Sequence, residues 1–155
     1  MNFASDNWAG VPDAVTAALA AAAEGPAPAY GADPLTAAAE ARISEVFERD
    51  CRVFFVATGS AANGLALAAY GKPGGIVLCH EGAHIATDEC GGPEFLAAMK
   101  LAGLPGADGK LTAEAVAAAI ALHGEDGVHH GRLAAVSLTQ ATELGTVYTP
   151  AEIAA

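Results

Sequence analysis

Residues 52–67 read RVFFVATGSAANGLAL and join a short apolar run to a glycine turn and a helix start. The run Val-Phe-Phe-Val at 53–56 contains only β-branched and aromatic residues, which is typical of a strand buried on both faces. Gly59 permits a tight turn, and Ser60 stands where the N-cap of the following helix is expected. The free N–H groups of residues 60–62 would then attract an anion at the positive end of the helix dipole. The stretch therefore predicts a buried strand followed by an anion-binding helix.

Helices and strands alternate along the chain. We expect helices over residues 14–24, 34–48, 61–70 and 113–122, a further helix from Pro150, and strands over 52–56, 74–78 and 133–138. Thr112 is the expected N-cap of the helix over 113–122, and a polar, glycine-containing segment occupies 80–92. This alternation indicates an α/β fold with a mainly parallel sheet, although three strands make a thin one.

The composition indicates a surface that other protein covers. The 155 residues fit one domain of ordinary size, of which 53% are hydrophobic and only 16% charged. The mean hydropathy of +0.35 is apolar for a monomer in water. The formal net charge of −11 argues against nucleic acid and anionic membrane surfaces as partners.

The cysteines and the apolar segments bear on the compartment. Cys51, Cys79 and Cys90 are an odd set without the spacing of a small disulfide-bonded domain, which favours a reducing cytoplasm. No stretch of the sequence is long and apolar enough to span a bilayer. We therefore expect a cytoplasmic protein.

Residues 80–84, His-Glu-Gly-Ala-His, spell the zinc motif H-E-x-x-H. That motif binds zinc when both histidines lie on one face of a helix and the glutamate acts as general base. Here it directly follows a predicted strand and contains Gly82, which weakens a helix. We expect no metal site, and a metal hydrolase using His80, Glu81 and His84 is the lesser alternative.

Several polar groups carry little information singly but more together. Ser5-Asp6-Asn7 could be a turn, His129-His130 a polar strand entry, and Thr142-Glu143 a loop cap. In combination and in order, the chain is similar to the low-specificity L-threonine aldolase family, which includes phenylserine aldolases. The segments that carry the resemblance are Phe3–Asn7 with Gly10, Tyr30-Gly31-x-Asp33, residues 58–63, Ala83-His84-Ile85 with residues 88–91, and residues 137–143 with Gly145 and Tyr148-Thr149.

The family consists of pyridoxal 5'-phosphate (PLP) enzymes with the aspartate-aminotransferase-like fold, fold type I. The resemblance implies part of the mainly parallel-sheet large domain of that α/β fold, preceded by an N-terminal helical segment. It divides the chain into an N-terminal arm with helices, residues 1–50, and an incomplete PLP-binding large domain, residues 51–155.

The resemblance also implies a cofactor site. Gly59, Ser60 and Ala61 match the turn that cradles the PLP phosphate, in agreement with the anion site expected at that helix start. His84 matches the histidine whose ring stacks on the cofactor, so it counts among both the cofactor-binding and the catalytic residues. On this reading the H-E-x-x-H match is accidental.

A substrate site follows from the same resemblance. Ser5 matches a residue that helps to hold the substrate carboxylate, and His129 a catalytic histidine near the β-hydroxyl, suited to proton transfer. The implied reaction cleaves a β-hydroxy-α-amino acid of the threonine or phenylserine type to glycine and an aldehyde. A homo-oligomer is the implied assembly of the complete enzyme.

Two features of the family have no counterpart in these residues. The family pairs the pyridine nitrogen with an aspartate in an Asp-Gly-x-Arg segment and carries a Schiff-base lysine further on. The lysines here, Lys72, Lys100 and Lys110, do not lie in that context. We expect an N-terminal portion that needs its C-terminal half as partner and is not catalytically competent alone. The alternative is an inactive or split fragment that acts only as a partner for that half.

Overall fold

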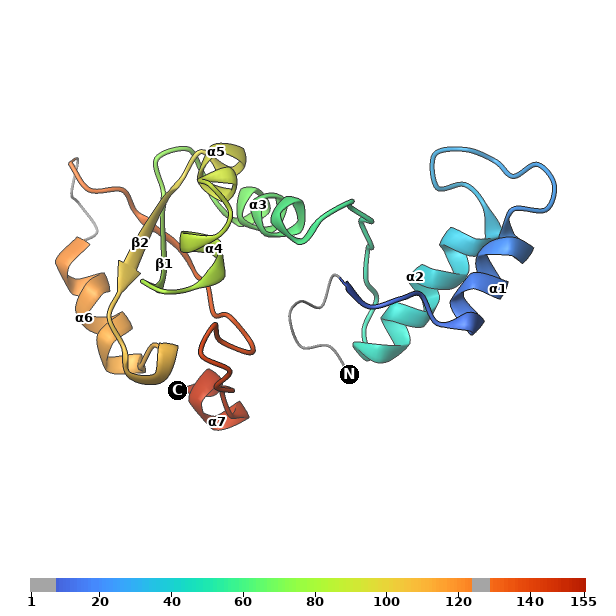
Figure 1. Ribbon diagram of the computed structural model, residues 1–155. Helices are drawn as coiled ribbons and strands as arrows, with labels where there is room; N and C mark the ends of the chain where they lie inside the picture. The colour runs from blue at the N-terminus through green and yellow to red at the C-terminus, as the bar shows by residue number, and fades with distance from the viewer. Residues whose placement is uncertain (1–7, 124–128) are drawn as a thin grey trace. The chain divides into compact units, whose positions relative to one another are not determined.

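The computed structural model describes residues 8–123 and 129–155, and the chain divides into two compact units, with the boundary in the sequence between Phe54 and Phe55 (Figure 1). The first unit contains α1 (Asp13–Ala22) and α2 (Pro34–Val46), so both expected helices form but end two residues early. Asp33 caps α2 because its carboxylate accepts hydrogen bonds from the Thr36 N–H (2.9 Å) and the Thr36 hydroxyl (2.6 Å). These bonds hold the pKa of Asp33 below its ordinary value.

The strand expected over residues 52–56 is absent, so this prediction is wrong. The segment takes no regular secondary structure, and Phe54 and Phe55 are 85% and 67% exposed. A strand needs a neighbour to accept and donate its backbone hydrogen bonds, and no described strand pairs with this segment. The apolar run signals burial but does not supply the partner strand.

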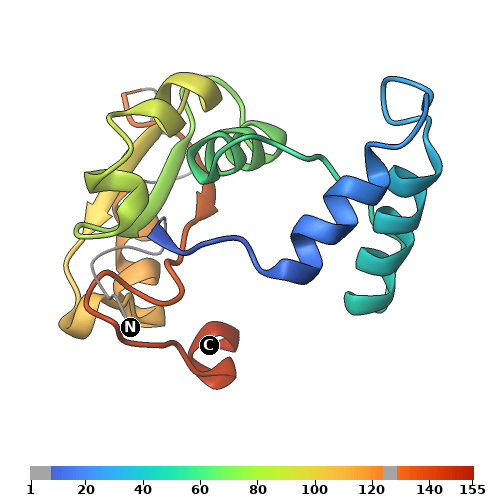
Figure 2. The same cartoon turned by 45° about the vertical axis from the view of Figure 1, so that its right-hand side comes forward.

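The second unit is built on a parallel sheet of three strands (Figure 1 and Figure 2). Central β1 (Ile76–His80) lies between β2 (Lys100–Leu104) and β3 (Leu133–Val136). The register sets Ile76 opposite both Lys100 and Leu133. The strands expected near 74–78 and 133–138 are thus confirmed, whereas β2 was not predicted because its sequence KLAGL has neither an apolar run nor a clear alternation.

Helices cover both faces of this sheet. The helices of this unit are α3 (Gly59–Tyr70), α4 (His84–Thr87), α5 (Gly92–Ala97), the short 3₁₀ helix η2 (Ala107–Gly109), α6 (Ala113–His123) and α7 (Pro150–Ala154). Of these, α3, α4 and α5 pack on one face and α6 on the other. Successive β1 residues belong to opposite core layers, as the alternation of a strand requires. One layer joins Val77 and Cys79 to α3, α4 and α5, and the other joins Ile76 and Leu78 to α6.

This three-layer arrangement confirms the α/β fold. The end of β1 leads through a short turn into α4, and β3 contacts α3. Within residues 8–123 and 129–155, none of the helices has the length and apolar character needed to cross a bilayer.

Candidate functional site

The start of α3 is the candidate anion site. Thr58, with φ −142° and ψ 157°, is the N-cap, and its hydroxyl accepts a hydrogen bond from the Ala61 N–H at 3.2 Å. Its carbonyl oxygen accepts another from the Ala62 N–H at 3.1 Å. Ser60 was the expected N-cap, and that prediction is wrong because Thr58 offers an equivalent hydroxyl two residues earlier. The N–H groups left without an intrahelical acceptor are therefore those of Gly59 and Ser60.

Gly59 leaves this helix start open. It is exposed, and a Cβ built on it would have no atom within 4 Å. Its backbone is helical and not left-handed, so the turn itself does not require glycine. The missing side chain instead keeps the two N–H groups accessible to an approaching anion.

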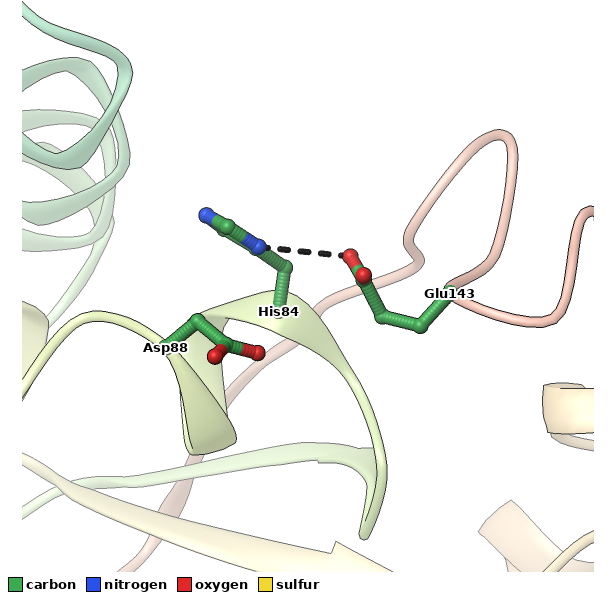
Figure 3. A group of neighbouring side chains, drawn as sticks. All are labelled: His84, Asp88 and Glu143. Carbon is green, nitrogen blue, oxygen red and sulfur yellow. Dashed lines mark ion pairs between the residues drawn. The ribbon is translucent and has the colours of Figure 1, made fainter. Parts of the chain in front are cut away.

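His84 begins α4 and points away from the core. Its neighbours Ala83 and Ile85 are buried and anchor the helix, which leaves the histidine ring exposed. Ring atom Nδ1 lies 3.3 Å from Glu143 Oε1 (Figure 3). Asp88 presents a carboxylate oxygen that is within 4.8 Å of these ligand-type atoms. All three side chains are exposed, and two of them, His84 and Glu143, already contact each other.

The other edge of the His84 ring faces a buried carboxylate. Glu89 Oε1 lies 3.7 Å from His84 Nε2 and accepts a hydrogen bond of 2.7 Å from the Asn63 side-chain amide. The Glu89 side chain is only 1% exposed, and its Oε2 has no hydrogen-bond partner among the described residues. Cys90 (φ +50°) and Gly91 (φ +71°) follow in left-handed conformations and turn the chain into α5. Glu89 thereby links α3 to the start of α4.

Glu143 is held by a tightly closed loop between β3 and α7. The Gln140 side chain donates to the Tyr148 carbonyl at 2.9 Å and accepts from the Tyr148 N–H at 2.8 Å. Inside this closure, buried Thr142 bonds Thr146 through both backbone (2.9 Å) and hydroxyl groups (2.7 Å). The loop is therefore fixed at its base, and Glu143 extends from it toward His84.

His80 is occupied by bonds within the protein. Its Nδ1 accepts from the Gly82 N–H at 3.0 Å, and its Nε2 lies 3.0 Å from the Gly106 carbonyl oxygen, which makes Nε2 the donor. The sequence HEGAH runs from the end of β1 through a turn to the first residue of α4, so its histidines do not share a helix face. Neighbouring Cys79 is buried, which raises the pKa of its thiol. The zinc arrangement of Glu81 with both histidines thus lacks its helix.

The structure does not join all predicted site residues. The Asn63–Glu89–His84 contacts link α3, which begins with residues 59–61, to His84, but no described contact joins residues 59–61 to His84 directly. His129 is exposed in a turn before β3, near the N-terminal end of that strand, and no described contact connects it with His84. Ser5 lies outside the described residues, so its role stays a prediction, as does that of His129.

Two residues of this site were not predicted from the sequence. Glu89 lies in one of the segments that carry the family resemblance, but no role was predicted for it, and Glu143 was interpreted as a loop cap. The contacts that reveal them join residues far apart, such as Asn63 with Glu89, 26 positions on.

Residues 2–155 match the family described as "Beta-eliminating lyase". A low specificity L-threonine aldolase of Pseudomonas aeruginosa is 47% identical over 154 residues, covering 99% of this chain and 44% of that protein. One of a Pseudomonas species is 43% identical with the same coverage. A solved threonine aldolase of Leishmania major is similar at a TM-score of 0.86 and 27% identity, over 94% of this chain and 42% of that one. The chain spans less than half the length of these relatives.

Proposed function

We propose, since the chain belongs to the beta-eliminating lyase family, that it supplies the phosphate site and the ring-stacking histidine of a PLP-dependent aldolase. The reaction is cleavage of a β-hydroxy-α-amino acid, of the threonine or phenylserine type, to glycine and an aldehyde. The relatives at 43% and 47% identity, both low specificity L-threonine aldolases, support this assignment. The observation that carries it is the Asn63–Glu89–His84 connection, which couples the open start of α3 to an exposed imidazole.

The helix start fits a phosphate group. Gly59 and Ser60 offer two backbone N–H groups at the positive end of a 12-residue helix, and nothing blocks the approach at Gly59. The Ser60 hydroxyl adds a third donor beside them. Thr58 binds the next two N–H groups, so it shapes the site without competing for the anion.

His84 fits a planar ring in the same way. Both of its ring edges face carboxylates, Glu89 on one side and Glu143 on the other. These contacts hold the imidazole by its edges and leave its faces for stacking. When bound, PLP supplies the electron sink for breaking the Cα–Cβ bond. Ser5 at the substrate carboxylate and His129 at the β-hydroxyl complete the proposal on the strength of the family resemblance.

The whole enzyme requires groups outside these residues. Lys110 is engaged with Glu152 at 3.0 Å. Lys72, after the C-terminal end of α3, and Lys100, at the start of β2, are exposed. The relatives are more than twice as long as the segment they share with this chain. We propose that the lysine that binds PLP covalently and the aspartate that pairs with its ring nitrogen come from a C-terminal portion. The complete enzyme is a homo-oligomer. It works in the cytoplasm, where Cys51, Cys79 and Cys90 stay free thiols.

Phosphate recognition can be tested apart from catalysis. Pyridoxamine phosphate, which has no aldehyde to react with surface lysines, is titrated against the chain beside phosphate-free pyridoxamine. We expect preference for the phosphorylated compound, and Gly59→Ala should weaken its binding about tenfold because a methyl group enters the anion's path. Ser60→Ala should also weaken it, by the loss of one charge-assisted bond, about 1–3 kcal/mol.

Gly92→Ala is the matched control. Gly92 also begins a helix and has open space where its Cβ would stand, but its N–H already donates to the Glu89 carbonyl oxygen at 2.8 Å and is not free for an anion. Its substitution should leave pyridoxamine phosphate affinity unchanged. Equal affinity of the wild-type chain and the Gly59→Ala variant, or an equal loss in the Gly92→Ala control, would place the phosphate elsewhere.

A further inference from the structure

The Glu89 carboxylate is buried with unusually few partners. Its side chain is 1% exposed, yet one oxygen has a single donor, Asn63, and the other has none among the described residues. Buried carboxylates are costly and are normally paired or fully hydrogen-bonded. A neutral glutamine of the same shape would meet the structural need of Asn63 with less desolvation. The charge therefore points to a task beyond packing.

That task concerns His84. The Glu89 Oε1 atom stands 3.7 Å from Nε2, and Glu143 Oε1 stands 3.3 Å from Nδ1, so the two ring nitrogens face different carboxylates. A neutral imidazole carries one N–H and can donate to only one of them. The third acidic group near the ring, Asp88, accepts from the Thr87 hydroxyl at 2.6 Å. Glu89 is the buried member of the set, whereas Glu143 and Asp88 are exposed to competing water.

We propose that Glu89 is a positioning residue that fixes the tautomer and ring plane of His84, with the proton on Nε2. An ion pair or a polar contact in a buried environment is screened less by water than one at the surface. The buried Glu89 therefore has the stronger influence on the His84 proton, although it lies farther from the ring than Glu143. Asn63 holds Glu89 in place from α3, four residues after Gly59. The same carboxylate thereby sets the histidine ring relative to the open helix start.

This inference rests on the proposed function only in that the orientation of the His84 ring would serve stacking on PLP. The orientation of His84 is a property of the chain without any ligand, and it is tested in that state. Failure of pyridoxamine phosphate to bind would contradict the proposed function but would leave the tautomer measurement valid. The two outcomes are therefore distinguishable.

The experiment measures the ¹⁵N chemical shifts of the His84 ring at about pH 9, where an ordinary imidazole is neutral. The wild-type chain should carry the proton on Nε2. Glu89→Gln should move it toward Nδ1, which faces Glu143, while the melting temperature stays equal or rises because a buried charge is removed. A ring that keeps its Nε2 proton in the Glu89→Gln variant would overturn the proposal.

Glu143→Gln provides an independent test that leaves the buried carboxylate intact. Glu143 is exposed, so its substitution does not disturb the core. If Glu89 sets the tautomer, the proton stays on Nε2 in this variant. If the wild-type ring carries its proton on Nδ1 and the proton moves to Nε2 in the Glu143→Gln variant, then Glu143 sets the tautomer. This result would refute the role of Glu89, whether or not Glu89→Gln folds.

Discussion

Replacing Gly64 by alanine probes the contact between α3 and α5, on which the site depends. Gly64 is buried in α3, and a Cβ built there would lie 2.6 Å from Leu96 Cδ1, 3.0 Å from Leu96 Cβ and 3.4 Å from Leu96 Cγ. Favourable carbon–carbon contacts require about 3.5–4.0 Å. Leu96 is 48% exposed, so its methyl group can rotate away, but its Cβ is fixed to the backbone of α5. The helix must therefore shift by about half an ångström.

The expected magnitude combines two opposing effects. Alanine in a helix interior is favoured over glycine by about 1 kcal/mol. Overpacking a filled contact costs about 1–3 kcal/mol. The Gly64→Ala variant should therefore lose about 1 kcal/mol of unfolding free energy, and the shift of α5 should disturb the neighbouring Asn63–Glu89 bond.

Equilibrium urea unfolding followed by circular dichroism measures this change. Gly59→Ala is the control, since it lies in the same helix with open space at its Cβ and should be neutral or slightly stabilising. The reasoning would be refuted by a Gly64→Ala variant that is stabilised by about 1 kcal/mol, because helix propensity alone would then decide the outcome.

Three further predictions follow from other contacts. Tyr148→Phe should cost about 1–3 kcal/mol in urea unfolding, because the buried Leu111 N–H loses the tyrosine oxygen at 2.6 Å. The Thr149 backbone and the Lys110 ammonium lower the pKa of Glu152 to about 2. The resulting stabilisation of α7 is therefore complete above the ordinary pKa of 4.5 and is lost as the pH falls through about 2. A pH titration of the Glu152 carboxyl by NMR measures this, and a midpoint at the ordinary value would contradict it. The 155-residue chain should associate in sedimentation experiments and release no aldehyde from threonine, and turnover like that of an intact aldolase, or a compact monomer, would contradict this.

Apolar runs in the sequence predicted strands correctly only where the fold supplies neighbouring strands to pair with. The runs at 53–56 and 76–79 look alike, yet only the second lies between two partner strands. The sheet position of residues 100–104 came from pairing with β1 and not from their own composition. Helices with a local cap were easier to predict, because a residue such as Thr112, which accepts from the Ala115 N–H at 3.2 Å, fixes where the helix begins. The short helices α4 and α5 have no side-chain cap, and neither was predicted.

The candidate site was predictable as far as it is local. The glycine turn and the helix start at 58–61 could be predicted from neighbouring residues, although the N-cap was predicted at Ser60 and is Thr58, two residues earlier. The burial of Glu89 and its approach to His84 could not, because they depend on how α3, α4 and α5 pack. Tertiary contacts of this kind leave no period in the sequence.

Two hydrogen bonds between the Gln140 side chain and the Tyr148 backbone close the base of the loop after β3. The Gln140 amide reproduces the pairing of two strand residues, so the two ends of the loop are joined independently of what lies between them. At the tip, Glu143 and Leu144 are exposed, and their side chains take no part in the two Gln140–Tyr148 bonds. Libraries that randomise these two positions, with Gln140 and Tyr148 retained, would vary the chemistry presented to His84 while the scaffold stays constant. The tip of this loop is therefore the place where the groups beside His84 can be changed while the surrounding structure is kept.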